Sequence, residues 1–302
     1  MEPERSSLPA ETLELAARHG LSLVSEISFN EMGLDYRVAF TRDVQGKRWV
    51  LRIPRRAELF SKIQHEARIL NLVKQRLPVQ VPDWQICTGE LIAYPMLVDP
   101  VALTFDEKTY AVTWNIDQHS QAYVESLGAL LVALHATSAS DAVDAGLSHS
   151  SAEQARESVL GDIERVKSEI GIGADLELTL RKWLDDDKLW PAFSVLVHGD
   201  LYAGHVTADA SSRITGVIDW SEAEVSDPSI DFAGHLAVFG EESLEKLVAV
   251  YARLGGRTWS SMIEHVKGRQ AASPVKYGIF ALGSRREEHL AAARIQLGVT
   301  SD

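Results

Sequence analysis

Short alternating runs of apolar residues dominate the first hundred positions, after one amphipathic segment. A 3.6-residue apolar repeat predicts a helix over 8–19, and a second helical pattern covers 57–76. Alternating or β-branched runs separated by turn residues predict strands; they cover 21–27, 36–40, 48–53, 84–87 and 91–94. The order predicts a small antiparallel sheet of five strands that carries one inserted helix.

Beyond Pro100 the pattern changes to helices, the last of them broken near Gly283. The predicted helices cover 118–137, 151–168, 174–188, 229–238, 241–254, 257–269 and 273–297. Two short β-branched runs, 195–197 and 214–218, interrupt them and predict buried strands. The change of pattern predicts an α+β protein with two domains, residues 1–97 and residues 98–302.

Two acidic residues stand just beyond the two buried strands of the second domain. Asp200 follows Val-Leu-Val-His-Gly, and Gly199 allows a tight turn before it. Asp219 closes the next strand, so a β-hairpin would return it to the loop of Asp200. Phosphoryl transfer needs one carboxylate that orients a hydroxyl and one that holds Mg²⁺. We therefore expect Asp200 to be the catalytic base and Asp219 to bind the metal ion.

The neighbouring histidines and acids suggest supporting roles. His205 lies five residues after Asp200, where such a site needs a second metal ligand; a hydrogen bond to phosphate is the alternative. His198 is expected to hold the loop by hydrogen bonds. Asp227 and Asp231 have the spacing of an N-cap and a first-turn acid at a helix start, which favours structural roles.

The first domain contributes a basic residue and a carboxylate. Arg52 ends the third strand, and Glu66 follows on the helix. Kinases use such a pair to fix a positive group on nucleotide phosphates, although a surface ion pair is the simpler interpretation. The turn at 30–35 would lie over the phosphates; it has one glycine, Gly33, and no G-x-G-x-x-G pattern. The order of these residues before the two acids favours phosphate binding.

Composition limits the expected binding partners and the expected cellular compartment. A formal charge of −13 argues against nucleic acid and against an anionic membrane surface as partners. No run approaches about eighteen apolar residues, and the pattern of a secretory leader is missing at the start. The single cysteine, Cys87, excludes an internal disulfide and fits a reducing compartment. We expect a cytoplasmic monomer.

The motifs together resemble a known superfamily. The run His198-Gly-Asp-Leu with His205, then Ile218-Asp-Trp, then Asp227-Pro with Asp231, is similar to the aminoglycoside phosphotransferase and choline kinase superfamily, which shares the protein kinase fold. Within it, the segments 49–56 and 238–242, with His205 where most relatives have Asn, look like the macrolide 2′-phosphotransferases. The resemblance implies a bilobal protein-kinase-like fold: an antiparallel five-stranded N-terminal lobe with one helix, and a larger, mostly helical C-terminal lobe.

The resemblance also implies roles for residues on the donor side. Asp200 would accept the proton of a desosamine 2′-hydroxyl, and Asp219 with His205 would hold Mg²⁺. Arg52, where relatives usually have Lys, would contact the phosphates beside Glu66. The connector with Tyr94 and Met96 would hold the purine through backbone groups. Relatives of this branch favour GTP, and ATP is the alternative.

The acceptor side follows from the chemistry of a macrolide, a large apolar ring with a protonated amino sugar. Its site needs apolar walls and carboxylates near the reacting hydroxyl. Tyr277 and Phe280 offer apolar surface, although core packing explains them equally well, and Asp200 and Asp231 offer negative charge. Two interpretations stay open: a kinase for another acceptor, such as an aminoglycoside or a choline-like alcohol, and a non-catalytic module that binds nucleotide.

Overall fold

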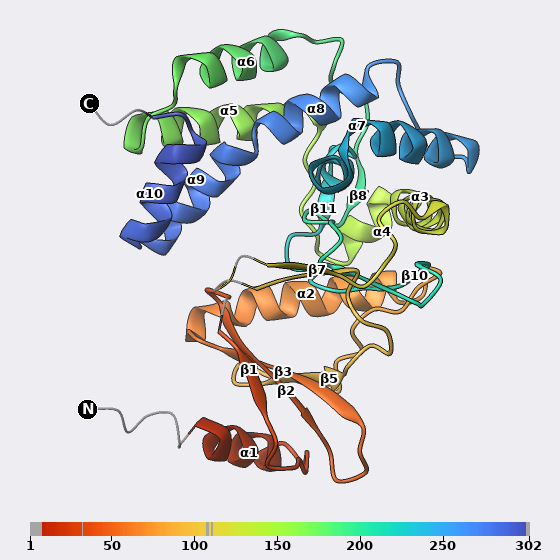
Figure 1. Cartoon of the computed structure of the whole chain (residues 1–302), viewed down its shortest axis with the longest axis vertical. Coiled ribbons are helices and arrows are strands. Elements are labelled where there is room, and N and C mark those ends of the chain that lie inside the picture. Colours follow the sequence, from red (N-terminus) through yellow and green to blue (C-terminus); the bar gives the residue numbers. More distant parts are fainter. Residues whose placement is uncertain (1–7, 32, 107–108, 110, 300–302) are drawn as a thin grey trace.

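The computed structural model describes residues 8–31, 33–106, 109 and 111–299, and it consists of two lobes stacked along the long axis of the molecule (Figure 1). The N-terminal lobe is a five-stranded antiparallel sheet with helices on its two faces, in the strand order β1-β2-β3-β5-β4. Its elements are α1 (Leu8–Arg18), β1 (Ser28–Asn30), β2 (Tyr36–Arg42), β3 (Arg48–Pro54), η1 (Ala57–Leu59), α2 (Phe60–Val73), β4 (Ile86–Cys87) and β5 (Ile92–Pro95). The expected sheet with one inserted helix is confirmed.

The first strand begins later than the sequence pattern predicts. The segment 21–27 is tied to β2 by separate bonds only: Val24 N–H donates to the Arg42 carbonyl, and the Thr41 hydroxyl donates to the Glu26 carbonyl. A continuous ladder with β2 begins at Ser28. The alternating pattern of 21–27 therefore reflects packing of this segment beside α1 rather than a strand.

Alternation along β3 gives the sheet two apolar faces. Trp49 and Leu51 pack in the cluster on the α1 side, and Val50 packs with Ile63 in the cluster on the α2 side. Because successive side chains of a strand point to opposite faces, Arg52 shares the α2 face with Val50. This register aims the guanidinium of Arg52 at α2.

The C-terminal lobe is mostly helical, as expected, and it contains six short strands that form three antiparallel pairs. Its elements are β6 (Leu103–Phe105), β7 (Val112–Trp114), α3 (Gln121–His135), α4 (Ala139–Asp144), α5 (Ala152–Glu169), α6 (Ala174–Asp185), β8 (Val195–Val197), β9 (Val206–Ala208), β10 (Ile214–Val217), β11 (Glu224–Ser226), α7 (Ile230–Arg253), α8 (Met262–Ala271), α9 (Ser273–Ser284) and α10 (Glu287–Gln296). None of the helices in the described ranges is long and apolar enough to cross a bilayer.

Several C-terminal elements differ from the sequence prediction. The hairpin of β6 and β7 lies before the first predicted helix of this lobe, in a segment for which no element was predicted. The polar connector after α3 contains α4, which begins where the Ser138 hydroxyl accepts from Asp141 N–H. Two other breaks agree with the prediction: Gly240, which has non-helical φ and ψ, lies between the predicted helices 229–238 and 241–254, and the last predicted helix, expected to break near Gly283, divides at Arg285, whose φ is 56°.

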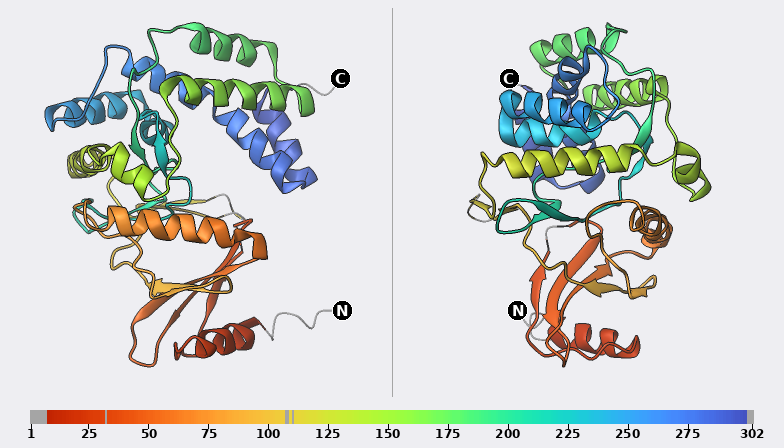
Figure 2. Two further views of the ribbon diagram at one scale, coloured as in Figure 1. Left: turned by 180° about the vertical axis from the view of Figure 1, so that it is seen from behind. Right: turned by 90° about the vertical axis from the view of Figure 1, so that its right-hand side faces the viewer.

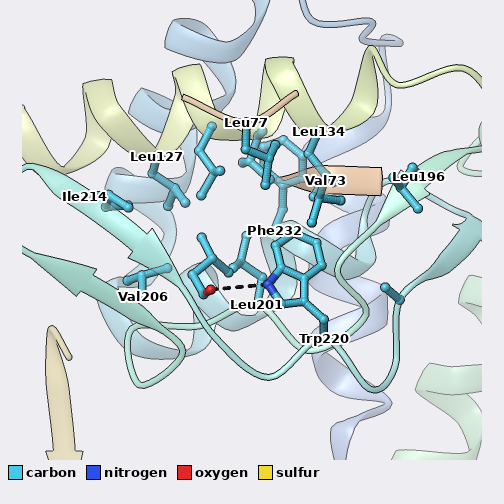
Figure 3. Packing of buried hydrophobic residues seen from close by; sticks show 14 of the residues in the cluster. Val73, Leu77, Leu127, Leu134, Leu196, Leu201, Val206, Ile214, Trp220 and Phe232 are labelled. Carbon is cyan, nitrogen blue, oxygen red and sulfur yellow. Dashed lines mark hydrogen bonds between the residues drawn. The ribbon is translucent and has the colours of Figure 1, made fainter. Parts of the chain in front are cut away.

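Helix α2 joins the two lobes. Ile63, near its start, packs in the N-terminal cluster, whereas Ile69 and Val73 belong to the large core of the C-terminal lobe. The three views of the chain show α2 lying across the junction between the sheet and the helical lobe (Figures 1 and 2). In that core Val73 lies near Trp220, whose indole N–H donates to the Val217 carbonyl (Figure 3). The position of Glu66, halfway along α2, is therefore fixed relative to both lobes.

Candidate active site

The loop 198–205 after β8 carries the predicted catalytic base. Gly199 has φ of 88°, and a Cβ there would lie 2.2 Å from the Glu222 carbonyl oxygen, so only glycine fits this turn. The turn exposes Asp200, whose side chain is 48% accessible. The Asp200 carboxylate is therefore presented at the surface on a rigid backbone.

Asp231 holds this loop from beneath. Its carboxylate accepts from His198 N–H at 2.9 Å and from Gly199 N–H at 3.1 Å, and His135 Nε2 lies 3.3 Å away. Gly234, one turn further along α7, allows the helix to approach the loop, since a Cβ there would lie 2.2 Å from the Leu201 carbonyl oxygen. Asp231 is 1% exposed. The structure thus does not bring Asp231 to the solvent-accessible site, and its geometry is that of a loop support rather than of the predicted substrate contact.

His198 connects the loop to the strand that ends at Asp219. Its Nδ1 accepts from Asp200 N–H at 3.2 Å, which leaves Nε2–H to donate to the Ile218 carbonyl at 3.0 Å. These two bonds assign the neutral tautomer. Burial lowers the pKa of His198, and the nearby Asp231 carboxylate opposes that shift only in part. A neutral imidazole that makes these two hydrogen bonds supports the loop and is not placed to carry a proton.

The β9–β10 hairpin brings the second acid beside the first. His205 Nδ1 donates to the Asp200 carbonyl at 2.8 Å, so its Nε2 lone pair faces Asp219, whose Oδ2 lies 3.7 Å away. Burial raises the pKa of Asp219, but the Coulombic attraction of His205 in its protonated form and of the Arg52 guanidinium lowers it more, and the net pKa lies below its ordinary value. Asp219 is therefore ionised at neutral pH.

This donor pair fits a small divalent cation. Right-angle ligands about 2.1 Å from Mg²⁺ lie about 3 Å apart, close to the 3.7 Å between His205 Nε2 and Asp219 Oδ2. Within the described residues, no group of three or more His, Cys, Asp and Glu side chains could hold a metal ion. Since Mg²⁺ commonly takes one or two protein ligands and completes its shell with water and phosphate oxygens, two protein ligands agree with its chemistry.

Arg52 and Glu66 meet at the back of the site. Arg52 Nη1 donates to Glu66 Oε1 at 2.6 Å, and both residues are buried, at 8% and 1% exposure. The ring of Tyr36 lies over the guanidinium, with 4.2 Å between Cζ and the ring centroid. The stacking and the bond to Glu66 hold the guanidinium in one orientation, with its remaining donors available to phosphate oxygens.

A cleft of about 1270 Å³ lies between the lobes, and most of the predicted site residues line it. These are Gly33, Arg52, Tyr94, Met96, His205, Asp219 and Phe280. The predicted residues outside the lining are Glu66, His198, Asp200, Asp227, Asp231 and Tyr277. Asp200 lies next to a lining residue, with its Oδ2 3.6 Å from His205 Nδ1. Tyr277 packs against the apolar cluster of α5 and α9, with its ring 5.6 Å from that of Phe280. The structure therefore assigns to Phe280, rather than Tyr277, the apolar surface facing the cleft.

Asp227, which precedes α7, belongs to a second buried network. It accepts from His265 Nε2 at 2.7 Å and from Ser229 N–H at 2.9 Å, and it is paired with Arg269. Burial raises the pKa of Asp227, but these positive and hydrogen-bonding partners lower it well below its ordinary value. The network ties α8 to the start of α7, a structural position like the one the sequence predicted.

The connector after β5 leaves fewer backbone groups for a purine than its sequence suggests. Met96 lines the cleft, but its N–H donates to the Arg48 carbonyl at 2.9 Å. Tyr94 is 7% exposed, and burial raises the pKa of its phenol, which therefore stays protonated. A purine in this cleft would meet the Met96 side chain and the Tyr94 ring rather than the Met96 amide.

Sequence reasoning missed the charged residues around the 30–35 loop, of which Met32 lies outside the described residues. Glu31 is paired with Arg37 and Arg55, and Asp35 is paired with Arg56 and Lys62. Arg55 Nε also donates to the Gly33 carbonyl at 3.1 Å. Four cationic side chains thus hold this loop by ion pairs. The sequence signal was local: two acids in the turn and two arginines directly after β3.

Lys276 and Tyr202 were also missed. Lys276 Nζ lies 3.4 Å from Asp200 Oδ1, and the Tyr202 ring packs edge-on to His205 at 4.5 Å between centroids. Tyr202 could have been found from its place inside the loop 198–205. Lys276 lies on α9, far along the chain, and no sequence pattern links it to Asp200.

Comparisons with known proteins agree with this geometry. The model of the phosphotransferase enzyme family matches residues 26–265. The uncharacterized protein YcbJ of Bacillus subtilis (strain 168) is 39% identical over 298 residues, which cover 98% of this chain and 97% of the relative. A solved macrolide 2′-phosphotransferase type I is 46% identical with a TM-score of 0.93, covering 100% of both chains. The macrolide 2′-phosphotransferase MphH from Brachybacterium faecium is 38% identical with a TM-score of 0.88, covering 98% of this chain and 99% of that one.

Proposed function

The chain belongs to the phosphotransferase enzyme family, and from this premise we propose that it is a kinase that inactivates macrolide antibiotics. It transfers the γ-phosphoryl group of GTP, or less efficiently of ATP, to the 2′-hydroxyl of the desosamine sugar. The similarity to two macrolide 2′-phosphotransferases over nearly the whole chain supports this acceptor class.

One observation carries the catalytic part of the proposal. Asp200 and Asp219, nineteen positions apart, converge on the two nitrogens of His205: Nδ1 lies 3.6 Å from Asp200 Oδ2, and Nε2 lies 3.7 Å from Asp219 Oδ2. This arrangement supports a division of roles in which one carboxylate acts on the acceptor hydroxyl and the other on a cation at the phosphates. Phosphoryl transfer requires this separation of roles over a short distance.

The residues divide the reaction between them. Asp200 orients the 2′-hydroxyl and takes its proton as the hydroxyl oxygen bonds to the γ-phosphorus and the bond to the β–γ bridging oxygen breaks. The nucleoside diphosphate leaves with that oxygen. Arg52, oriented by Glu66, holds the phosphates. Asp219 and His205 would hold Mg²⁺, which supplies positive charge to the phosphate oxygens when bound. Positioning and charge neutralisation do most of the work, without a covalent enzyme intermediate.

The test is direct phosphorylation of a macrolide. Folded protein incubated with γ-labelled GTP and erythromycin should yield a singly phosphorylated drug with the label on the 2′-oxygen, and ATP in a parallel reaction should give a lower rate. Asp200→Asn should lower kcat/KM about 10²- to 10⁴-fold, the range for loss of a general base. Asp175→Asn, on the exposed first turn of α6, is the matched control and should behave like the parent. Unmodified drug, with folding verified, would reject this acceptor class.

A further inference from the structure

Helix α9 presents a cation to the proposed catalytic base. Lys276 Nζ lies 3.4 Å from Asp200 Oδ1 and 3.4 Å from the Gly199 carbonyl oxygen. Phe280, one turn later, and Ser284, two turns later, line the cleft. Because residues four apart share a helix face, Lys276 continues this face beyond the edge of the cleft. The acceptor side of the site therefore ends in a positive charge.

The two oxygens of Asp200 face different groups. Oδ2 lies 3.6 Å from His205 Nδ1, on the side of Asp219 and the metal position. Oδ1 faces Lys276 on the side of α9. The lysine is thus separated from the phosphate side by the carboxylate itself. Its charge acts on any group that approaches Oδ1 from the α9 side; in the proposed reaction that group is the acceptor.

We propose that Lys276 is a specificity-determining residue of the acceptor site, because its ammonium group pairs with Asp200 Oδ1, the carboxylate oxygen that a cationic acceptor must approach. The inference rests on the proposed function and deepens it. A desosamine amine lies on the carbon next to the 2′-hydroxyl and is protonated at neutral pH. When that hydroxyl reaches Asp200, two positive charges come within a few ångströms of each other, and they repel.

The contact between Lys276 and Asp200 is weak enough to be displaced by a cationic acceptor. The side chain of Lys276 is 68% exposed and that of Asp200 is 48% exposed, and exposed pairs of this kind contribute little to stability. Four rotatable bonds allow the ammonium to move into solvent. A cationic acceptor therefore binds only by displacing Lys276, and a neutral acceptor with the same hydroxyl binds without that displacement. Lys276 raises the KM of cationic acceptors relative to neutral ones.

The experiment compares one charged and one neutral acceptor. Steady-state kinetics are measured with erythromycin and with its N-oxide, which keeps the ring, the sugar and the 2′-hydroxyl but has no net charge at neutral pH. For Lys276→Met, the ratio of KM for the amine to KM for the N-oxide should fall about threefold to tenfold, as expected for removal of an exposed ion pair and a repulsion of similar size. Lys276→Arg should keep the parent ratio. Lys182→Met, an exposed lysine on α6, is the matched control.

Two results would overturn the assignment. The first is an unchanged KM ratio in Lys276→Met. The second is an equal loss of kcat with both acceptors, which would put the ammonium on the transferring phosphoryl group instead. Failure of the proposed function gives a different result. If the parent enzyme does not phosphorylate macrolides but phosphorylates another cationic alcohol, the proposed substrate class is wrong. The same variants are then compared on that alcohol and its neutral counterpart. A parent that phosphorylates no alcohol rejects both.

Discussion

The two loops that border the cleft use the same chemical groups but are held in opposite ways. In the loop 198–205, the carboxylate of Asp231 accepts backbone N–H groups in a fully buried setting. In the 30–35 loop, the carboxylates of Glu31 and Asp35 pair with arginine and lysine side chains that remain partly exposed. Water and salt weaken the second kind of contact but not the first.

The difference agrees with the roles proposed for the two loops in phosphoryl transfer. A base must stay within a fraction of an ångström of its position, so buried hydrogen bonds suit the loop of Asp200. A loop over the phosphates must release its cations to an arriving triphosphate, so exposed and exchangeable ion pairs suit it. Each of the following predictions changes one side of this comparison.

The largest effect is expected when the buried support is broken. Asp231→Asn exchanges one carboxylate oxygen for an amide N–H₂, which cannot accept from His198 N–H or Gly199 N–H. One backbone donor is left buried and unpaired, so the free energy of unfolding should fall by about 3 kcal/mol. Because Asp200 follows directly, kcat of the folded fraction should fall about 100-fold. Urea unfolding and drug phosphorylation measure the two losses.

Asp227→Asn is the matched control for that variant. Asp227 is also buried and accepts from Ser229 N–H and His265, but it makes no bond to the loop of Asp200. It should lose a similar free energy of unfolding while keeping kcat within a few-fold of the parent. Equal losses of kcat in the two variants would show that the position of Asp200 depends on the overall stability of the lobe and not on the hydrogen bonds of Asp231.

Acidification should destabilise the fold through two buried histidines, His198 in the loop 198–205 and His235 on α7. His198 and His235 are buried, and burial lowers the pKa of each below the ordinary 6.5, to about 4 for His235. The unfolded chain therefore binds more protons in this range, so the free energy of unfolding is complete above pH 6.5 and falls as the pH drops from 6.5 towards 4. For His235 this loss is about 2 kcal/mol at pH 5.

His235→Gln tests that prediction, because glutamine does not titrate. Between pH 7.5 and pH 5 the variant should lose about 2 kcal/mol less unfolding free energy than the parent, measured by urea unfolding at both values. The 30–35 loop titrates at lower pH than the buried histidines. Burial raises the pKa of Glu31, but hydrogen bonds from Arg55 and Arg37 lower it more, and the net pKa lies below 4.5. Identical pH dependence in parent and variant would exclude His235 as the group that titrates.

Sequence patterns predicted which residues lie near each other wherever the relation was local. Asp200 and Asp219 were assigned because each closes a short β-branched run, and a hairpin between them needs no long-range information. Arg52 and Glu66 were paired because a strand and the following helix usually pack together. In both cases the chain itself brings the groups close: Arg52 and Glu66 form an ion pair, and Asp200 and Asp219 each lie within 3.7 Å of His205.

Long-range placement was the part that could not be predicted. Asp231 has the sequence appearance of a first-turn acid, and only the packing of α7 under β8 puts it against two amides of the loop. Lys276 reaches Asp200 through the position of α9, which depends on the packing of three other helices. The segment 21–27 alternates like a strand but packs beside α1, since burial of one face does not require a continuous ladder.

The smallest effect is expected in the exposed loop, where Asp35→Asn frees Arg56 and Lys62 from their shared carboxylate. Since both partners are largely exposed, the free energy of unfolding should change by less than about 0.5 kcal/mol. Arg56, Lys62 and Asp35 all line the cleft, so in the parent a triphosphate competes with Asp35 for the two cations. The KM for GTP should therefore fall about twofold to threefold, and the difference should shrink in 0.5 M salt, where the Debye length is only about 4 Å.

Asp83→Asn provides the matched control, because Asp83 forms an exposed pair with Lys74 and does not line the cleft. It should leave the KM for GTP unchanged at both salt concentrations. A rise in KM for Asp35→Asn would reverse the interpretation of the loop: the ion pairs would then hold it in the shape that binds phosphate, and the two sides of the cleft would differ in the exposure of their contacts but not in their purpose.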